Sequence, residues 1–136
     1  MTANTGVDSS WQDETKNDLR HARDNLESLV SSIAGELTGE QLRTLWEAYL
    51  LVEKSVVFVK VELDEENPGR FINSKHYVVP DERQAVGFAL RNLRESIERF
   101  EAGHLAASLK ALREARNYLR TLLKRKRRER LRKVRA

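Results

Sequence analysis

The chain has 136 residues, of which 40% are hydrophobic and 34% charged, with 6 glycines, 2 prolines and no cysteine. This length and composition predict one folded domain with a hydrophobic core and exclude an intrinsically disordered chain. The absence of cysteine excludes disulfides and thiolate metal sites, and the scarcity of helix breakers favours an all-α fold.

Residues 1–8 are small and mostly polar, and we expect them to be disordered. They lack the basic and apolar regions of a secretory signal peptide, and no later stretch is apolar over the length needed to span a bilayer. We therefore expect a soluble, cytoplasmic protein that does not associate with membranes.

A bundle of helices is predicted over residues 9–123, and its first helix begins at Ser9 or Ser10, which can serve as the N-cap. Leu19, Leu26 and Ile33 recur at intervals of seven residues. This spacing predicts a helix with a narrow apolar face.

The second predicted helix starts at the sequence TGEQ, where Thr38 is the N-cap and Gln41 completes a capping box. An apolar heptad stripe follows, made of Leu42, Leu45, Tyr49, Val52, Val56, Val59 and Leu63. The segment SVVFVKVEL also alternates like a β-strand, but the stripe continues through it without a turn signal, so we prefer a helix. Trp46 adjoins the stripe and is expected in the core. This helix carries further apolar residues on its other faces, namely Leu50, Leu51, Val57, Phe58 and Val61. Such a surface predicts self-association, for example as a homodimer.

A long connection, DEENPGRFINSKHYVV, follows and contains a strong turn signal at Asn67, Pro68 and Gly69. Its cations alternate with rings, a pattern typical of loops that stack unpaired bases beside a charged backbone. The candidate stacking residues are Arg70, Phe71, Lys75, His76 and Tyr77. The alternative is that the apolar residues of this loop cover one end of the core.

The third helix is expected to start at Pro80, and its apolar stripe extends from Val86 to Phe100, before Gly103 ends it. A fourth helix follows from Leu105. The short junctions predict two antiparallel hairpins, and together these form a four-helix up-down bundle with a basic helical extension at the C-terminus.

Residues 124–136, KRKRRERLRKVRA, form a basic tail. Between Lys124 and Arg135 lie nine Lys or Arg and one Glu, so this segment carries a net charge of +8, against +4 for the whole chain and −4 for the remainder. Such a tail, with basic residues of the preceding helix, predicts binding to a phosphate backbone. The candidate nucleic-acid-binding residues are Arg113, Arg116, Arg120, Lys124, Arg125, Lys126, Arg127, Arg128, Arg130, Arg132, Lys133 and Arg135. The alternatives are that the cations only complement a helix C-terminus and keep the chain soluble, or that they bind an acidic protein.

The stretch from Ala89 to Leu123, ALRNLRESIERFEAGHLAASLKALREARNYLRTLL, resembles the last part of the HEPN superfamily of small helical bundles. This resemblance implies an RNase, a toxin or a nucleotide-binding partner. In the RNase members an Arg and a His separated by four to six residues form the active site across a dimer, and Arg99 and His104 have this spacing. Here Phe100 replaces a residue that is usually polar, and Gly103 separates the pair.

Metal and cofactor signals are weak. Glu101 and His104 have the Glu-x-x-His spacing of di-iron bundles without a second copy, and the three histidines match no zinc motif. The chain contains no Walker loop, no GxGxxG and no GxSxG. We expect no metal and no cofactor.

The function that these patterns favour is that of a small non-enzymatic helical protein that binds DNA or RNA through its basic arm, as an accessory subunit of a larger assembly. The alternatives are a HEPN-type RNase or toxin component, and a structural adaptor between proteins.

Overall fold

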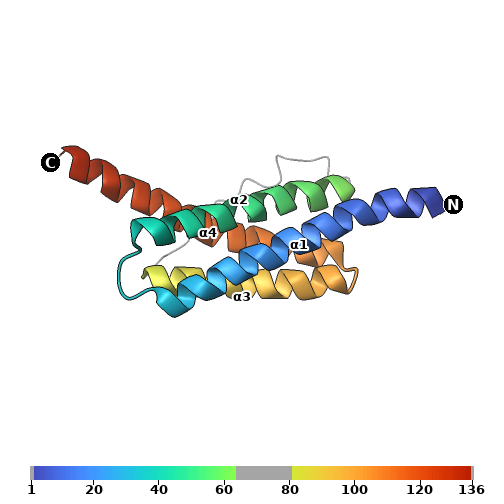
Figure 1. Cartoon of the computed structure of the whole chain (residues 1–136), viewed down its shortest axis with the longest axis horizontal. Coiled ribbons are helices and arrows are strands. Elements are labelled where there is room, and N and C mark those ends of the chain that lie inside the picture. The colour runs from blue at the N-terminus through green and yellow to red at the C-terminus, as the bar shows by residue number, and fades with distance from the viewer. Residues whose placement is uncertain (1, 64–80, 136) are drawn as a thin grey trace.

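The computed structural model describes residues 2–63 and 81–135, and of residues 2–9 and 135 only the backbone. It contains four helices, α1 (Thr2–Ser32), α2 (Gly39–Glu62), α3 (Glu82–Glu101) and α4 (Leu105–Arg135), which pack side by side as a bundle (Figure 1). The predicted all-α, four-helix fold is therefore confirmed. The candidate stacking loop, Arg70 to Tyr77, lies outside the described residues.

The core has the composition that the heptad stripes predict. Leu45, Val52 and Val59 of α2 are fully buried, and leucines of the other helices meet them. Because the stripe of α2 is buried as far as Val59, the segment SVVFVKVEL is helical through Glu62 and the β-strand alternative is wrong. Each helix packs against two others: α1 contacts α2 and α3, and α4 contacts the same two.

All neighbouring helices are antiparallel, but the chain does not reverse at every connection. The backbone NH of Leu37, just before α2, donates to Glu82 at the start of α3 across 2.7 Å. At the opposite end, Arg20 of α1 pairs with Glu101 at the end of α3, also at 2.7 Å. Helices α2 and α3 therefore start at the same end of the bundle and run parallel on a diagonal (Figure 1).

The parallel run of α2 and α3 differs from the predicted up-down order, in which consecutive helices are antiparallel. The long connection predicted from the sequence thus joins diagonal helices, and the two hairpins lie side by side in the order α1, α2, α4, α3.

The helix ends follow the local sequence. Thr38 caps α2 in the predicted capping box with Gln41. Helix α3 begins two residues later than expected from Pro80: Glu82 is its first residue, and Asp81 is its N-cap and accepts a hydrogen bond from the Gln84 backbone NH at 2.7 Å. Gly103 follows the C-cap of α3, in the turn between α3 and α4, and has φ of 82° in the left-handed region, where a side chain is disfavoured.

The first and last helices, α1 and α4, are longer than their apolar stripes predict. Helix α1 already begins at Thr2, whereas the sequence predicts disorder over residues 1–8 and a start at Ser9 or Ser10. Extension costs little, because adding a residue to an existing helix needs no new nucleus and Gly6 is the only strong breaker in this stretch. None of the described helices combines the length and the apolar character that crossing a membrane requires.

Two small polar residues set the spacing of the α3–α4 hairpin. The hydroxyl of Ser96 donates to the backbone carbonyl of Ser108 at 2.9 Å, and the hydroxyl of Ser108 donates to the carbonyl of Ser96 at 2.8 Å. Both residues are fully buried. Side chains of this size let the two backbones approach closely while both of these hydroxyls keep a partner.

Candidate nucleic-acid interface on helix α4

The C-terminal part of α4 extends past the ends of the other helices (Figure 1). Most of its basic side chains are exposed there: Lys124, Arg127, Arg128, Arg130, Arg132 and Lys133. None of them forms an ion pair with the residues that the structure describes. The side chain of Arg135 lies outside the described part of the chain.

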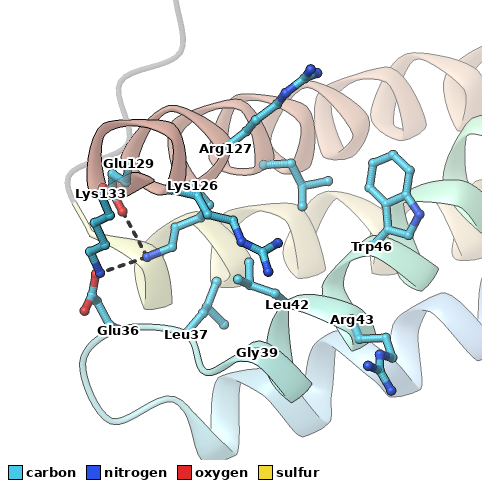
Figure 2. A pocket seen from close by; sticks show the side chains of 12 residues that line it. Glu36, Leu37, Gly39, Leu42, Arg43, Trp46, Lys126, Arg127, Glu129 and Lys133 are labelled. Atoms are coloured by element: carbon cyan, nitrogen blue, oxygen red, sulfur yellow. Dashed lines mark hydrogen bonds and ion pairs between the residues drawn. The ribbon is translucent and has the colours of Figure 1, made fainter. Parts of the chain in front are cut away.

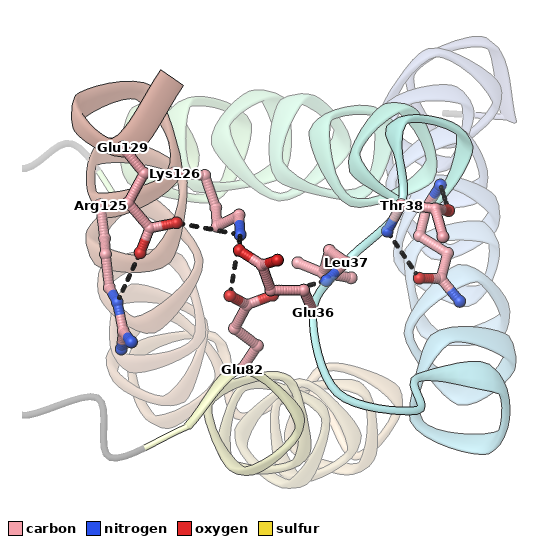
Figure 3. A network of polar contacts seen from close by, with 8 residues as sticks. Glu36, Leu37, Thr38, Glu82, Arg125, Lys126 and Glu129 are labelled. Atoms are coloured by element: carbon pink, nitrogen blue, oxygen red, sulfur yellow. Dashed lines mark hydrogen bonds and ion pairs between the residues drawn. The ribbon is translucent and has the colours of Figure 1, made fainter. Parts of the chain in front are cut away.

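Lys126 differs from its neighbours because it points into the end of the bundle (Figure 3). Its side chain is only 9% exposed, and its Nζ lies 2.9 Å from Glu82, 3.0 Å from Glu129 and 3.3 Å from Glu36. An ammonium group has three donors, so each carboxylate takes one. Lys126 was expected to bind nucleic acid, but contact with a phosphate would require breaking these bonds.

The same cluster joins all the segments that meet at this end of the bundle. Glu82 accepts from Lys126 with one oxygen and from the Leu37 backbone NH with the other. Glu36 comes from the connection between α1 and α2, and Glu129 from the next turn of α4. The bundle therefore continues beyond the boundary expected after residue 123, as far as Glu129.

The pairings determine the ionisation of the cluster. Burial alone would lower the pKa of the Lys126 ammonium, but the hydrogen bonds that it donates to Glu82, Glu129 and Glu36 outweigh burial and hold the pKa above its usual value. The hydrogen bond from Lys126 in turn lowers the pKa of Glu129, against a smaller opposing effect of desolvation. Lys126 is therefore charged at neutral pH.

The oxygens of Glu36, Glu82 and Glu129 all lie within 4.8 Å of one another, a grouping that could hold a metal ion. The Lys126 ammonium already lies among them and supplies the positive charge that such a group requires. Sequence reasoning missed this cluster, because its members are scattered over three segments. The one available signal was Glu129, the only acidic residue within the basic tail.

The cations that precede the tail belong to the side of the bundle. Arg116 is half-buried and approaches Glu53 of α2 at 3.7 Å, and Arg120 donates to Asn117 at 3.0 Å. Burial lowers the pKa of Arg116, while the nearby Glu53 opposes this. Glu53 also accepts from the Tyr49 hydroxyl at 2.7 Å. Arg113 is likewise only partly exposed, so the predicted basic stripe is exposed mainly from Lys124 onward.

The exposed cations of the tail divide between two faces of α4. Lys124, Arg128 and Arg132 follow one another at intervals of four residues and so share a face, here called the outer face. Arg127, Arg130 and Lys133 instead line a groove between the end of α4 and the start of α2. Arg125 is partly buried beside Glu129, at 3.4 Å.

The candidate catalytic pair lies at the opposite end of α4. Both Arg99 and His104 are exposed, and Arg99 is near Glu95 at 4.0 Å. Their backbones meet, since the His104 NH donates to the Arg99 carbonyl at 2.8 Å around Gly103. No hydrogen bond links their side chains within residues 2–63 and 81–135. Glu101, of the Glu-x-x-His spacing, is paired with Arg20 instead.

Comparison of the chain with protein-family models, with curated proteins and with solved structures gave no significant match. The HEPN resemblance therefore stays a prediction.

Proposed function

We propose that the protein binds nucleic acid without catalysis, through the exposed cations of the C-terminal part of α4. The observation that carries this proposal is a helix that leaves the bundle with basic side chains on its exposed faces and no carboxylates paired to them in the described chain. Unpaired cations are available to displace the counterions condensed on a phosphate backbone.

The outer face suits this role best. Lys124, Arg128 and Arg132 are separated by about 6 Å of helix rise each, so they form a row along the projecting helix. They point away from the cluster around Lys126, and binding would leave that cluster intact. The body of the chain has a net negative charge and would face away from the polyanion, which is the arrangement expected of an accessory subunit in a DNA or RNA assembly.

The experiment measures fluorescence anisotropy of a labelled DNA duplex and a labelled single-stranded RNA with the full chain over a range of salt concentrations. We expect affinity without sequence preference and a log-log salt slope of about −3 on duplex DNA, because each of the three cations of the outer face contributes about 0.9 through one phosphate contact. The full chain is used because ending it at Leu123 would remove Lys126 and leave buried Glu82 without its cation.

Variants that replace an arginine with neutral glutamine show which cations contact the phosphates. Arg128→Gln with Arg132→Gln should make the slope less steep by about 2, one contact for each Arg. The matched control is Arg83→Gln with Arg91→Gln, which removes the same charge from exposed positions of α3 and should leave the slope unchanged. No binding at low salt, or an equal effect of both pairs, would overturn the proposal.

A further inference from the structure

A groove of about 710 Å³ opens between the start of α2 and the end of α4 (Figure 2). It exists because α4 continues past the bundle while α2 begins only at Gly39, so the two helices diverge and no other helix of the described chain covers the space between them. It is separate from the outer face on which the proposed nucleic-acid binding rests.

The floor of the groove is apolar. It is formed by Leu37, Leu42 and Leu123, with Trp46 at one side. The sequence suggested that Trp46 lies in the core, but 49% of it is exposed, and its ring lies against Tyr49 with centroids 5.5 Å apart. An exposed indole beside leucines is typical of the pocket that receives an apolar anchor from a partner.

The rim of the groove is cationic on both sides. Arg43 of α2 faces the groove from one side, and Arg127, Arg130 and Lys133 of α4 from the other. None of these forms an ion pair within the described part of the chain. The two carboxylates of the lining, Glu36 and Glu129, are both bonded to Lys126. The groove therefore offers unneutralised positive charge around an apolar floor.

We propose that this groove binds an acidic amphipathic helix of a partner protein. The apolar face of such a helix would cover the leucines and Trp46, and its carboxylates would meet Arg43, Arg127 and Arg130. Two diverging helices with an apolar floor between them form the geometry in which a third helix packs, with anchors at helical spacing. Opposite charges at the rim add specificity and speed association.

Other occupants fit less well. Single-stranded nucleic acid binds by stacking bases on aromatic rings, whereas this floor is aliphatic apart from Trp46. A second copy would bring its own basic arm toward the same cations. Its most acidic described helix, α1, is already packed against α2 and α3, and Glu14 and Asp18 of this helix pair with Lys54.

The probe is a synthetic peptide of about 16 residues, helical, with leucines on one face, glutamates elsewhere and no aromatic residue, which would extend about 24 Å along the groove. The chain has 2 tryptophans, so in a Trp11→Phe background the emission reports Trp46 alone. We expect saturable binding and a shift of Trp46 emission to shorter wavelength. A peptide of the same composition with its leucines scattered should not produce this shift.

Charge-reversal variants test whether the peptide binds in the groove or on the outer face. Arg43→Glu with Arg130→Glu should weaken peptide binding about tenfold, because rim attractions become repulsions. Arg128→Glu with Arg132→Glu, the matched reversal on the outer face, should change it by less than about threefold at 0.15 M salt, where charges beyond about 8 Å are screened. Thermal melts confirm that each variant is folded.

Four results would overturn the inference: no binding of the peptide, equal binding of the scattered peptide, equal effects of the two reversals, or a Trp46 shift caused by single-stranded RNA instead. The last result would assign the groove to the nucleic-acid interface. A concentration-dependent Trp46 shift without peptide, together with dimers in sedimentation, would show that a second copy occupies the groove. Loss of nucleic-acid binding in the outer-face variant alone would leave this inference unaffected.

Discussion

The Nζ of Lys126 donates a hydrogen bond of 2.9 Å to Glu82, and both side chains are buried. The pair joins the last turns of α4 within the bundle to the first turn of α3 and, through the second oxygen of Glu82, to the backbone of Leu37. Three carboxylates around one ammonium leave the cluster dependent on that ammonium.

Removing the ammonium should therefore destabilise the fold strongly. We expect Lys126→Met to lower the free energy of unfolding by about 3–5 kcal/mol at pH 7, because it leaves the buried carboxylate of Glu82 without a counter-charge. Urea denaturation followed by circular dichroism measures this. Lys124→Met, an exposed neighbour, should change the same quantity by no more than about 0.5 kcal/mol, and similar losses in both variants would contradict the role of the cluster.

The same two variants should behave in the opposite way toward nucleic acid. Lys124→Met should reduce the salt slope of duplex binding by about 0.9, the value of one phosphate contact. Lys126→Met, measured at a temperature at which it is folded, should leave the slope unchanged because its ammonium already has three carboxylate partners. A smaller slope for Lys126→Met would mean that the cluster opens on binding.

Acid should weaken the cluster through Glu129. Its pKa is lower in the folded chain than in the unfolded chain, chiefly because of the hydrogen bond from Lys126. The unfolded chain therefore binds more protons as the pH falls below about 4.3, the usual value for Glu, and the stabilisation that is present above this pH is lost as the pH falls through the folded-state pKa.

Unfolding free energies between pH 7 and pH 3 measure this effect. The difference in unfolding free energy between the wild-type chain and Glu129→Gln should become smaller as the pH falls toward 3. Glu98→Gln, an exposed residue of α3, should give a curve parallel to that of the wild type. Parallel curves for Glu129→Gln would show that its ionisation does not affect stability.

The two glycines of the α3–α4 hairpin should respond to alanine with opposite signs. Gly103 has φ of 82°, so Gly103→Ala should destabilise the fold by about 1–2 kcal/mol. Gly87 lies inside α3, where an added Cβ would meet nothing within 4 Å, and Gly87→Ala should stabilise the fold by up to about 1 kcal/mol. Thermal denaturation distinguishes the two, and a loss of stability in both would refute this account of Gly87.

The close approach at Ser108 should not tolerate a larger side chain. We expect Ser108→Leu to lower the free energy of unfolding by about 1–3 kcal/mol, since it inserts volume where two backbones meet and removes a buried hydrogen bond. Ala107→Leu, at the exposed neighbouring position, is the control and should change little. Chemical denaturation of both variants gives the comparison, and equal values would mean that the hairpin can widen at no cost.

Much of the fold could be predicted from the sequence because its signals are local. Apolar spacings of three and four residues define helical faces, and the Thr38 capping box and Gly103 mark helix ends. The basic run was equally visible, since charge can be read directly. These features depend on residues within a few turns of one another, whose geometry the helix itself sets.

The tertiary structure decided what depends on segments far apart in the chain. The parallel direction of α2 and α3 could not be predicted, because an up-down order satisfies the same apolar stripes. The sequence also could not show that Lys126 differs from the exposed cations around it, because its partners Glu36 and Glu82 lie far from it in the chain. The order of residues along the chain by itself determined that the protein would be helical with a basic end. Packing determined which of those cations are buried in the bundle and which remain free to bind.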